Sequence, residues 1–178
     1  MMTDLRSSAS GQGGYTLIEL MVASAIGLIV MSGLTSVVLT TWRAGTIATS
    51  RIEASGQIRA FEFVAYDDFA HSGVSNLGSC TKQAPCTTQP IVLTGTQVNN
   101  SGQPVPAYTV TYTWDGSSFL DRFVAASGTT THAATNVSAL SWYLDGSAPN
   151  QTVVVTLTVS VQAYSETQTF RFYPRVNP

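Results

Sequence analysis

A run of twenty residues without a charged side chain, from Leu20 to Leu39, most constrains how this chain can fold. At a rise of about 1.5 Å per residue, a helix of that length spans the roughly 30 Å hydrocarbon core of a bilayer. Glu19 comes directly before the run, and Gly13 and Gly14 lie a few residues earlier. The sequence therefore predicts a membrane-spanning helix that begins beside one isolated carboxylate.

Two simpler explanations of this segment fit the sequence less well. A secretory signal peptide needs a basic start, an apolar region of about 7–15 residues and an exit of small residues. Residues 1–14 carry one acid, Asp4, and one base, Arg6, and the apolar run is too long. A plain membrane anchor remains compatible with the hydropathy, but it gives no reason for Gly13-Gly14 or for Glu19.

The stretch from Gly13 to Val22 resembles the prepilin signal of type IV pilins and of the pseudopilins of type II secretion. The resemblance implies that a prepilin peptidase cuts between Gly14 and Tyr15 and methylates the new N-terminus on Tyr15. It also implies an assembly role for Glu19, whose carboxylate would pair with the N-terminal amine of a neighbouring subunit. Pairing with the chain's own Tyr15 amine, one helical turn away, is the alternative, and both stay open.

The same resemblance implies where the protein resides and what it assembles with. It places the chain in the bacterial inner membrane with a periplasmic C-terminal domain, and afterwards in a pilus with other major and minor pilins. The charges flanking the apolar run do not set this orientation, because Arg6 on one side faces Arg43 and Arg51 on the other.

Helical character continues beyond the apolar run. No proline occurs between Arg43 and Ala70, and Ser72-Gly73 is a stop signal. Apolar residues at spacings that include three and four predict a stripe that faces a domain: Ile47, Ile58, Phe61, Ala65 and Phe69. The expected segments are a leader (1–14), an apolar helix (15–42), an amphipathic continuation (43–73) and a β-sheet domain (74–178).

The end of the predicted helix, from Phe63 to Gly73, is similar to that of the PilW-like minor pilins, and so is the stretch from Ala25 to Val30. That subfamily often has an arginine near the Asp67-Asp68 pair, and no arginine is near it in this sequence. We interpret the pair as a solvated helix face, with a calcium site as the less favoured reading.

From Gln89 onward the apolar period changes to two, which is typical of half-buried strands. Asp115-Gly116 predicts a hairpin turn. The expected strands are 90–93, 108–114, 119–124, 137–144, 152–163 and 166–173. A long helix packed on one antiparallel sheet, an α+β fold, is the predicted architecture.

Cys80 and Cys86 flank a short segment of turn composition. In an exported domain a disulfide between them is the favoured reading, and two free thiols are the alternative. A zinc site is disfavoured, because His71 and His132 show no ligand spacing. We expect His71 to lie at the helix end and His132 to lie in a solvated loop.

The charge of the chain argues against nucleic-acid binding as its main role. Its formal net charge is −2, and the C-terminal domain offers few basic residues, notably Lys82, Arg171 and Arg175. No catalytic or phosphate-binding motif is present, so neither an enzyme nor a cofactor is expected. The leading hypothesis is a minor pilin, with a minor pseudopilin second and a DNA- or surface-binding pilin third.

Overall fold

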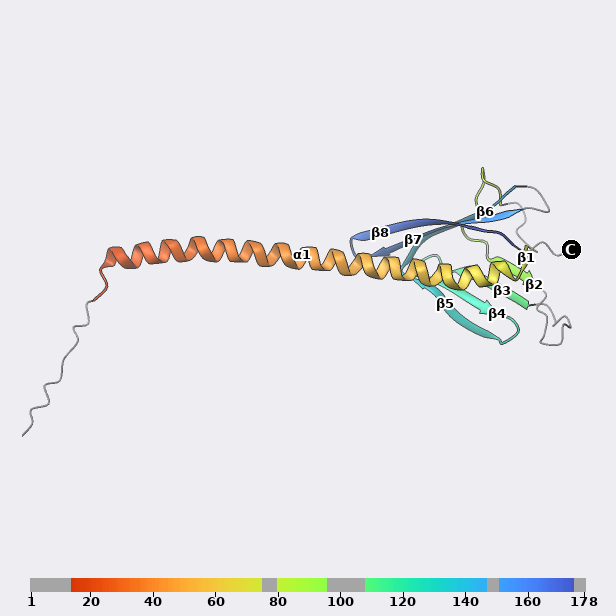
Figure 1. Cartoon of the computed structure of the whole chain (residues 1–178), viewed down its shortest axis with the longest axis horizontal. Coiled ribbons are helices and arrows are strands. Elements are labelled where there is room, and N and C mark those ends of the chain that lie inside the picture. The colour runs from red at the N-terminus through yellow and green to blue at the C-terminus, as the bar shows by residue number, and fades with distance from the viewer. Residues whose placement is uncertain (1–13, 75–79, 96–107, 147–150, 175–178) are drawn as a thin grey trace, which may run out of the picture. The chain divides into compact units, whose positions relative to one another are not determined.

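The computed structural model describes residues 14–74, 80–95, 108–146 and 151–174 of this protein (Figure 1). Contacts divide the chain into two compact units, Met1–Gly45 and Thr46–Pro178, which are described separately below. One long helix, α1 (Leu17–Ala70), contributes to both units. Its C-terminal end is closed by the Ser72 hydroxyl, which donates a hydrogen bond to the Asp68 carbonyl.

The second unit combines the last turns of α1 with two antiparallel sheets. One sheet has five strands in the order β1 (Gly73–Val74), β2 (Ile91–Gly95), β3 (Tyr108–Trp114), β4 (Phe119–Val124) and β5 (Thr129–Thr135). The other has three, β6 (Val137–Asp145), β7 (Thr152–Val161) and β8 (Tyr164–Phe172). The α+β fold is confirmed, although the strands form two sheets and not the single sheet expected.

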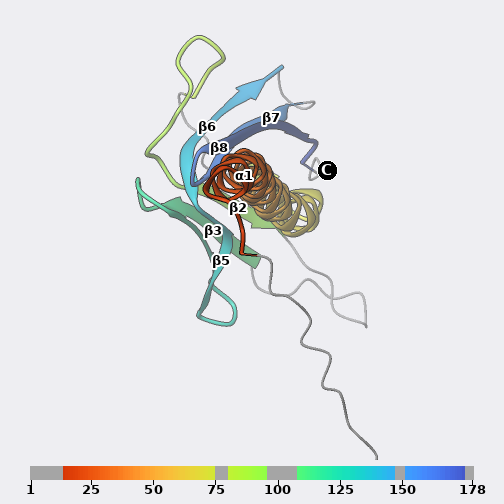
Figure 2. The same ribbon diagram turned by 90° about the vertical axis from the view of Figure 1, so that its left-hand side faces the viewer.

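Within this unit, α1 lies between the two sheets (Figure 2). Phe61 shows how the helix joins them, because its ring packs edge-on against Tyr112 of β3 at 6.0 Å and Phe170 of β8 at 5.4 Å. The expected inward stripe is buried at Ile58, Phe61, Ala65 and Phe69. It is wrong at Ile47, which is 58% exposed.

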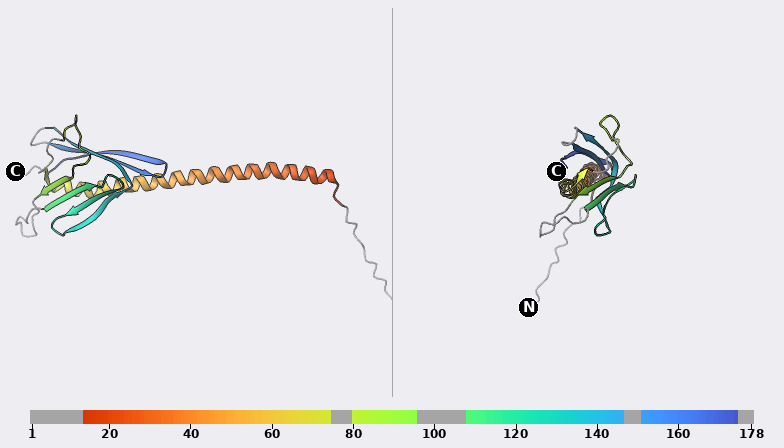
Figure 3. Two further views of the ribbon diagram at one scale, coloured as in Figure 1. Left: turned by 180° about the vertical axis from the view of Figure 1, so that it is seen from behind. Right: turned by 90° about the vertical axis from the view of Figure 1, so that its right-hand side faces the viewer.

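Strand β5 was not expected from the sequence, which has only threonine, histidine and alanine at these positions. It forms because β4 provides a hydrogen-bonding edge, and a register shift opposite Leu120 and Asp121 accommodates one extra residue. The shift allows both Ala133 and Ala134 to be buried, although they are adjacent. The β4–β5 hairpin is also visible from behind in Figure 3.

The outer edge of β6 is covered by the segment that contains the disulfide. Cys80 and Cys86 are bonded to each other. Cys86 and Trp142 exchange two backbone hydrogen bonds of 2.9 Å, and the Leu144 amide donates to the Cys80 carbonyl at 3.0 Å. The disulfide therefore holds in place a short extension of the sheet that occupies an edge otherwise open to other strands.

We expect Phe61→Ala to lower the free energy of unfolding of the second unit by about 3–5 kcal/mol, because a buried ring that contacts both sheets is lost. Phe63→Ala is the matched control, since Phe63 lies two residues away and is 83% exposed. Urea unfolding of the detergent-solubilised chain, followed by tryptophan fluorescence, measures both. Equal losses in the two variants would contradict this account of the core.

Candidate functional site

The junction where cleavage is expected is open to solvent. Gly14 to Thr16 have no regular secondary structure, and α1 begins at Leu17. Tyr15 is 87% exposed, and a Cβ built on Gly14 would meet no atom within 4 Å. The rest of the expected leader, including Gly13, lies outside the described residues. At Gly14, therefore, no side chain would obstruct a peptidase that approaches the Gly14–Tyr15 peptide bond.

Glu19 closes the first turn of α1 by a reciprocal pair of hydrogen bonds with Thr16. The Thr16 amide donates to Glu19 Oε2 at 2.9 Å, and the Glu19 amide donates to Thr16 Oγ1 at 3.3 Å. This is a capping box, in which two otherwise unpaired amides of a helix N-terminus are satisfied. Thr16 is not among the site residues expected above, although the signal Thr-x-x-Glu at residues 16–19 predicts a capping box.

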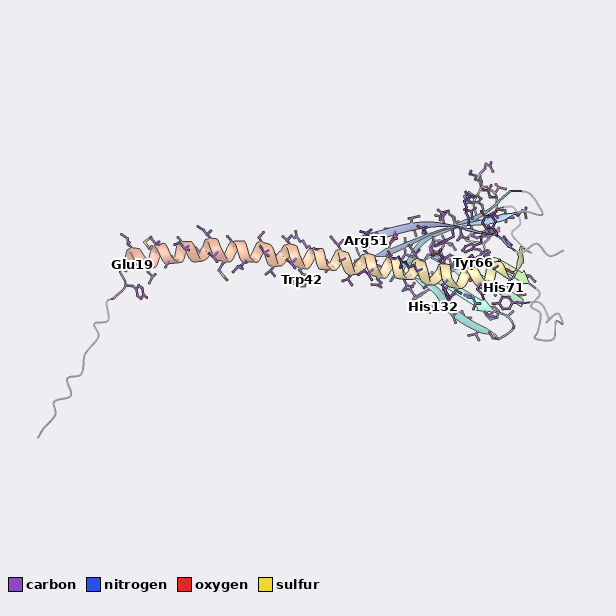
Figure 4. All side chains as sticks on the ribbon, viewed as in Figure 1. Glu19, Trp42, Arg51, Tyr66, His71 and His132 are labelled. Carbon is purple, nitrogen blue, oxygen red and sulfur yellow. A yellow bond between two sulfur atoms is a disulfide. The ribbon has the colours of Figure 1, made fainter. Side chains whose placement is uncertain are left out.

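The capping box leaves Glu19 able to make a further contact. The Thr16 hydroxyl also donates to Glu19 Oε2, at 2.9 Å. Both described hydrogen bonds to the Glu19 carboxylate therefore end on Oε2, and the third bond between these residues is donated by the Glu19 amide. The second carboxylate oxygen keeps its acceptor capacity. Glu19 lies at the very start of α1 (Figure 4), where the helix dipole also favours a negative charge.

The apolar part of α1 has the length, composition and internal hydrogen bonds expected of a helix in the hydrocarbon core of a membrane. By length and composition α1 is able to cross a membrane, and the apolar window has no buried residue. Its hydroxyls donate to carbonyls within the helix, for example Ser24 to Met21 at 2.9 Å and Thr35 to Met31 at 2.8 Å. These polar side chains therefore need no partner from outside the helix.

The second unit contains one fully buried carboxylate, Asp68, among its described residues. Arg122 of β4 donates to it from both Nε and Nη2, at 2.6 and 2.7 Å. The hydroxyl of Tyr108 donates at 2.9 Å, and the hydroxyl of Tyr112 donates as well. A bidentate arginine and two phenols satisfy the lone pairs of the buried charge.

The environment of this cluster shifts the acidity of its members. Burial, followed by the hydrogen bond to Asp68, raises the pKa of Tyr108 to about 12. Burial and the charge of Asp68 also raise the pKa of Tyr112. The hydrogen bond to Asp68 raises the pKa of the Arg122 guanidinium. Both phenols are therefore kept protonated as donors, and the cluster ties the end of α1 to β3 and β4.

This cluster corrects two expectations. Asp67 is exposed, and its Oδ1 lies 3.3 Å from Nδ1 of His71. Asp68 is buried, so the interpretation of the pair as a solvated helix face is wrong for this residue. An arginine does accompany it, from a position 54 residues later in the sequence. The alternation of Leu120, Arg122 and Val124 would have placed that arginine on the inner face of its strand.

The two histidines occupy different settings. His71 follows α1, as expected, and its Nδ1 lies 2.8 Å from the Asp67 carbonyl. The expectation of a loop at His132 is wrong, because the residue belongs to β5. Its Nδ1 lies 2.6 Å from Asp121, and its ring stacks on Phe119 at 4.7 Å. No described cluster of three or more His, Cys, Asp or Glu side chains is suited to a metal.

Among the basic residues considered for nucleic-acid binding, Arg171 forms an ion pair within the chain. Arg171 pairs with Asp145 at 3.2 Å, so its charge is partly balanced locally. Lys82 lies in the disulfide segment, and Arg175 lies outside the described residues.

In comparisons with known proteins, only the N-terminal segment of this chain matches a known family model. Residues 9–35 match the family model of the prokaryotic N-terminal methylation motif. No curated protein and no solved structure matches the chain. The match covers the candidate cleavage junction, Glu19 and most of the apolar run.

We expect Arg122→Met to lower the free energy of unfolding by about 3–5 kcal/mol, because it leaves the Asp68 charge buried without its partner. Adding Asp68→Asn should recover much of that loss, since the buried charge is then removed as well. Arg171→Met removes a solvent-exposed ion pair and should cost at most about 1 kcal/mol. Urea unfolding of the three variants measures the differences, and equal costs for the two arginines would contradict the role of the buried pair.

We expect stability to fall as the pH rises from about 10 toward 12, because Tyr108 has a higher pKa in the folded state, about 12, than its ordinary value near 10. The stabilisation from its protonated hydroxyl is complete below pH 10 and is lost as the pH passes the folded value. Thermal unfolding between pH 8 and 12 measures the effect, with Tyr108→Phe as the comparison. A slope as steep in Tyr108→Phe as in the wild type would contradict it.

Proposed function

We propose that this chain, which belongs to the type IV pilin and pseudopilin family by its N-terminal methylation motif, is a minor pilin that initiates or joins a type IV pilus. The observation that carries the proposal is the matched motif followed by a helix able to cross a membrane and by a separate α+β unit. The role is structural. The exposed parts of the chain provide surfaces for other subunits, and no catalytic step is part of the proposal.

Prepilin peptidase is the first proposed partner. In this proposal it removes residues 1–14 and methylates the amine of Tyr15, and the exposure of Gly14 and Tyr15 supports access to the junction. The C-terminal unit then lies in the periplasm until other pilins draw the chain into a filament. The Cys80–Cys86 disulfide agrees with an exported domain.

Glu19 is proposed to guide assembly through charge. A carboxylate in an apolar layer costs roughly 2.5–3.5 kcal/mol at mid-membrane and less near the interface, so a cationic partner is favoured. The amine created at Tyr15 by cleavage is mostly protonated at neutral pH. Since the capping box leaves one Glu19 oxygen available, the carboxylate can hold the helix start and accept from such an amine, of its own chain or of a neighbour.

The alternative is a minor pseudopilin of a type II secretion system, which uses the same signal and the same segment order. The similarity of residues 63–73 to PilW-like minor pilins favours the pilus. The neighbouring genes distinguish the two, because pilus operons and secretion operons encode different partners.

We expect mass spectrometry of the filament-bearing cells to show loss of residues 1–14 and methylation of Tyr15 when prepilin peptidase is present. Glu19→Ala and Glu19→Gln should both be processed, but their incorporation into filaments should fall by at least about tenfold, because the charge is lost. Immunoblotting of sheared filaments measures incorporation.

Thr16→Ala is the matched control, because it breaks the capping box and leaves the Glu19 charge in place. It should be processed and incorporated close to the wild-type level. A chain that keeps its leader in peptidase-positive cells would contradict the proposed processing, and wild-type incorporation of Glu19→Gln would contradict the charge role.

A further inference from the structure

The first sixty residues contain only two aromatic side chains, Tyr15 and Trp42. They lie on either side of the uncharged run from Leu20 to Leu39, which has no aromatic residue of its own. Tyr15 is 87% exposed and Trp42 is 69% exposed. Figure 4 labels Trp42 on the same helix that begins beside Glu19. Packing within the described part of the chain therefore does not explain why two large rings frame the apolar run.

The spacing of the two rings matches the thickness of a bilayer. At a rise of about 1.5 Å per residue, Tyr15 and Trp42 are about 40 Å apart along the helix axis. A bilayer is about 40–45 Å thick with its headgroup layers, around a hydrocarbon core of about 30 Å. The midpoint between the two rings falls next to Ile29, and so does the midpoint of the uncharged run. When the run is centred in the core, both rings therefore reach the headgroup layers.

The chemistry of tryptophan favours the headgroup layer over the hydrocarbon core. The indole ring is apolar, but its N–H needs an acceptor, which lipid chains do not supply. In the second unit the Trp142 N–H donates to the Gln89 carbonyl at 3.1 Å. Trp42 is exposed, so phosphates, ester carbonyls and water of a headgroup layer can accept from it. Arg43, the first charged residue after the run, is attracted to the same phosphates.

The apolar run does not set the depth of the helix sharply by itself. Thr40 and Thr41 follow the run, and their hydroxyls donate within α1, to the carbonyls of Ser36 at 2.8 Å and Val37 at 2.9 Å. Such internally bonded residues enter or leave a hydrocarbon layer at small cost. Arg43 is also a soft marker, because its long side chain can extend toward the surface while its backbone shifts. The aromatic ring beside these residues is the sharper marker of depth.

We propose that Trp42 anchors α1 in the headgroup layer on one side of the membrane and thereby holds the Gly14–Tyr15 bond in the headgroup layer on the other side. The helix is continuous from Leu17 onward and has no proline, so a shift at Trp42 moves the cleavage junction by the same distance. The ligand is the lipid headgroup, and Trp42 is a positioning residue. The inference rests on the proposed function, because it concerns the chain as prepilin peptidase meets it.

The first experiment measures the depth of Trp42. The full-length chain is placed in phosphatidylcholine vesicles whose acyl chains carry bromine either near the headgroup or near the chain end, because bromine quenches nearby indoles. Subtracting the fluorescence of Trp42→Phe isolates Trp42 from Trp114 and Trp142. We expect bromine near the headgroup to quench this difference signal at least about twofold more strongly than bromine near the chain end. Quenching by the deep bromine that is equal or stronger, or no quenching by either, would overturn the anchor.

The second experiment measures cleavage by prepilin peptidase in unbrominated vesicles. The double variant Leu39→Trp with Trp42→Leu moves the ring about 4.5 Å along the helix, which draws the junction into the hydrocarbon layer. We expect this variant to be cleaved at least about fivefold more slowly than the wild type. Trp42→Tyr keeps an interfacial ring with a polar group and should be cleaved close to the wild-type rate. Leu34→Ala is the matched control, since it trims an exposed side chain of the same helix and leaves the ring in place.

Cleavage of the double variant at the wild-type rate would overturn the positioning role of Trp42. An equal loss in Leu34→Ala would overturn it as well, because the rate would then follow the apolarity of the helix and not the place of the ring. A wild-type chain that the peptidase leaves uncut would contradict the proposed processing, and with it the positioning role. The bromine measurement decides the anchor in either case, so the two failures are seen separately.

Discussion

The burial of one stripe of α1 between two sheets is the constraint on which the second unit depends. The described strands form two sheets that share no ladder, so strand pairing alone does not hold them together. Phe61 contacts aromatic rings from both sheets, and Phe69 stacks on Phe172 at 4.3 Å. One face of the helix thus joins the two sheets in a common core, and the opposite face of the helix is exposed.

A buried charge sets the position of the helix end more narrowly than apolar packing does. Apolar contacts tolerate small sliding motions, whereas the bidentate bond of Arg122 to Asp68 requires one alignment of α1 against β4. The phenols of Tyr108 and Tyr112 add directional bonds from β3. The Coulombic attraction and the hydrogen bonds offset the cost of burying the carboxylate in that geometry, and loss of one partner would leave a buried charge unpaired.

The two ends of α1 illustrate opposite uses of a carboxylate. Asp68 is enclosed and fully partnered, so it serves the fold. Glu19 is exposed, and within the described part of the chain its bonds to Thr16 leave one carboxylate oxygen available, so it serves the fold and remains able to meet another group. Between them, the helix surface passes from an apolar run to a stretch of mixed apolar and charged residues.

The sequence by itself determined the features that depend on local pattern. The length of the apolar run, the motif around Gly14 and Glu19, the α+β class and the alternating strands such as β7 all follow from residue spacing over short distances, and the family model and the fold confirm the motif and the class. Only the tertiary structure decided which distant residues meet. Arg122 reaches Asp68 across 54 positions, β5 forms because β4 offers it an edge, and the disulfide segment covers β6. Periodicity reports which face of an element is buried, but a partner is chosen by packing and by the need to neutralise a buried charge, and those conditions exist only once the chain has folded.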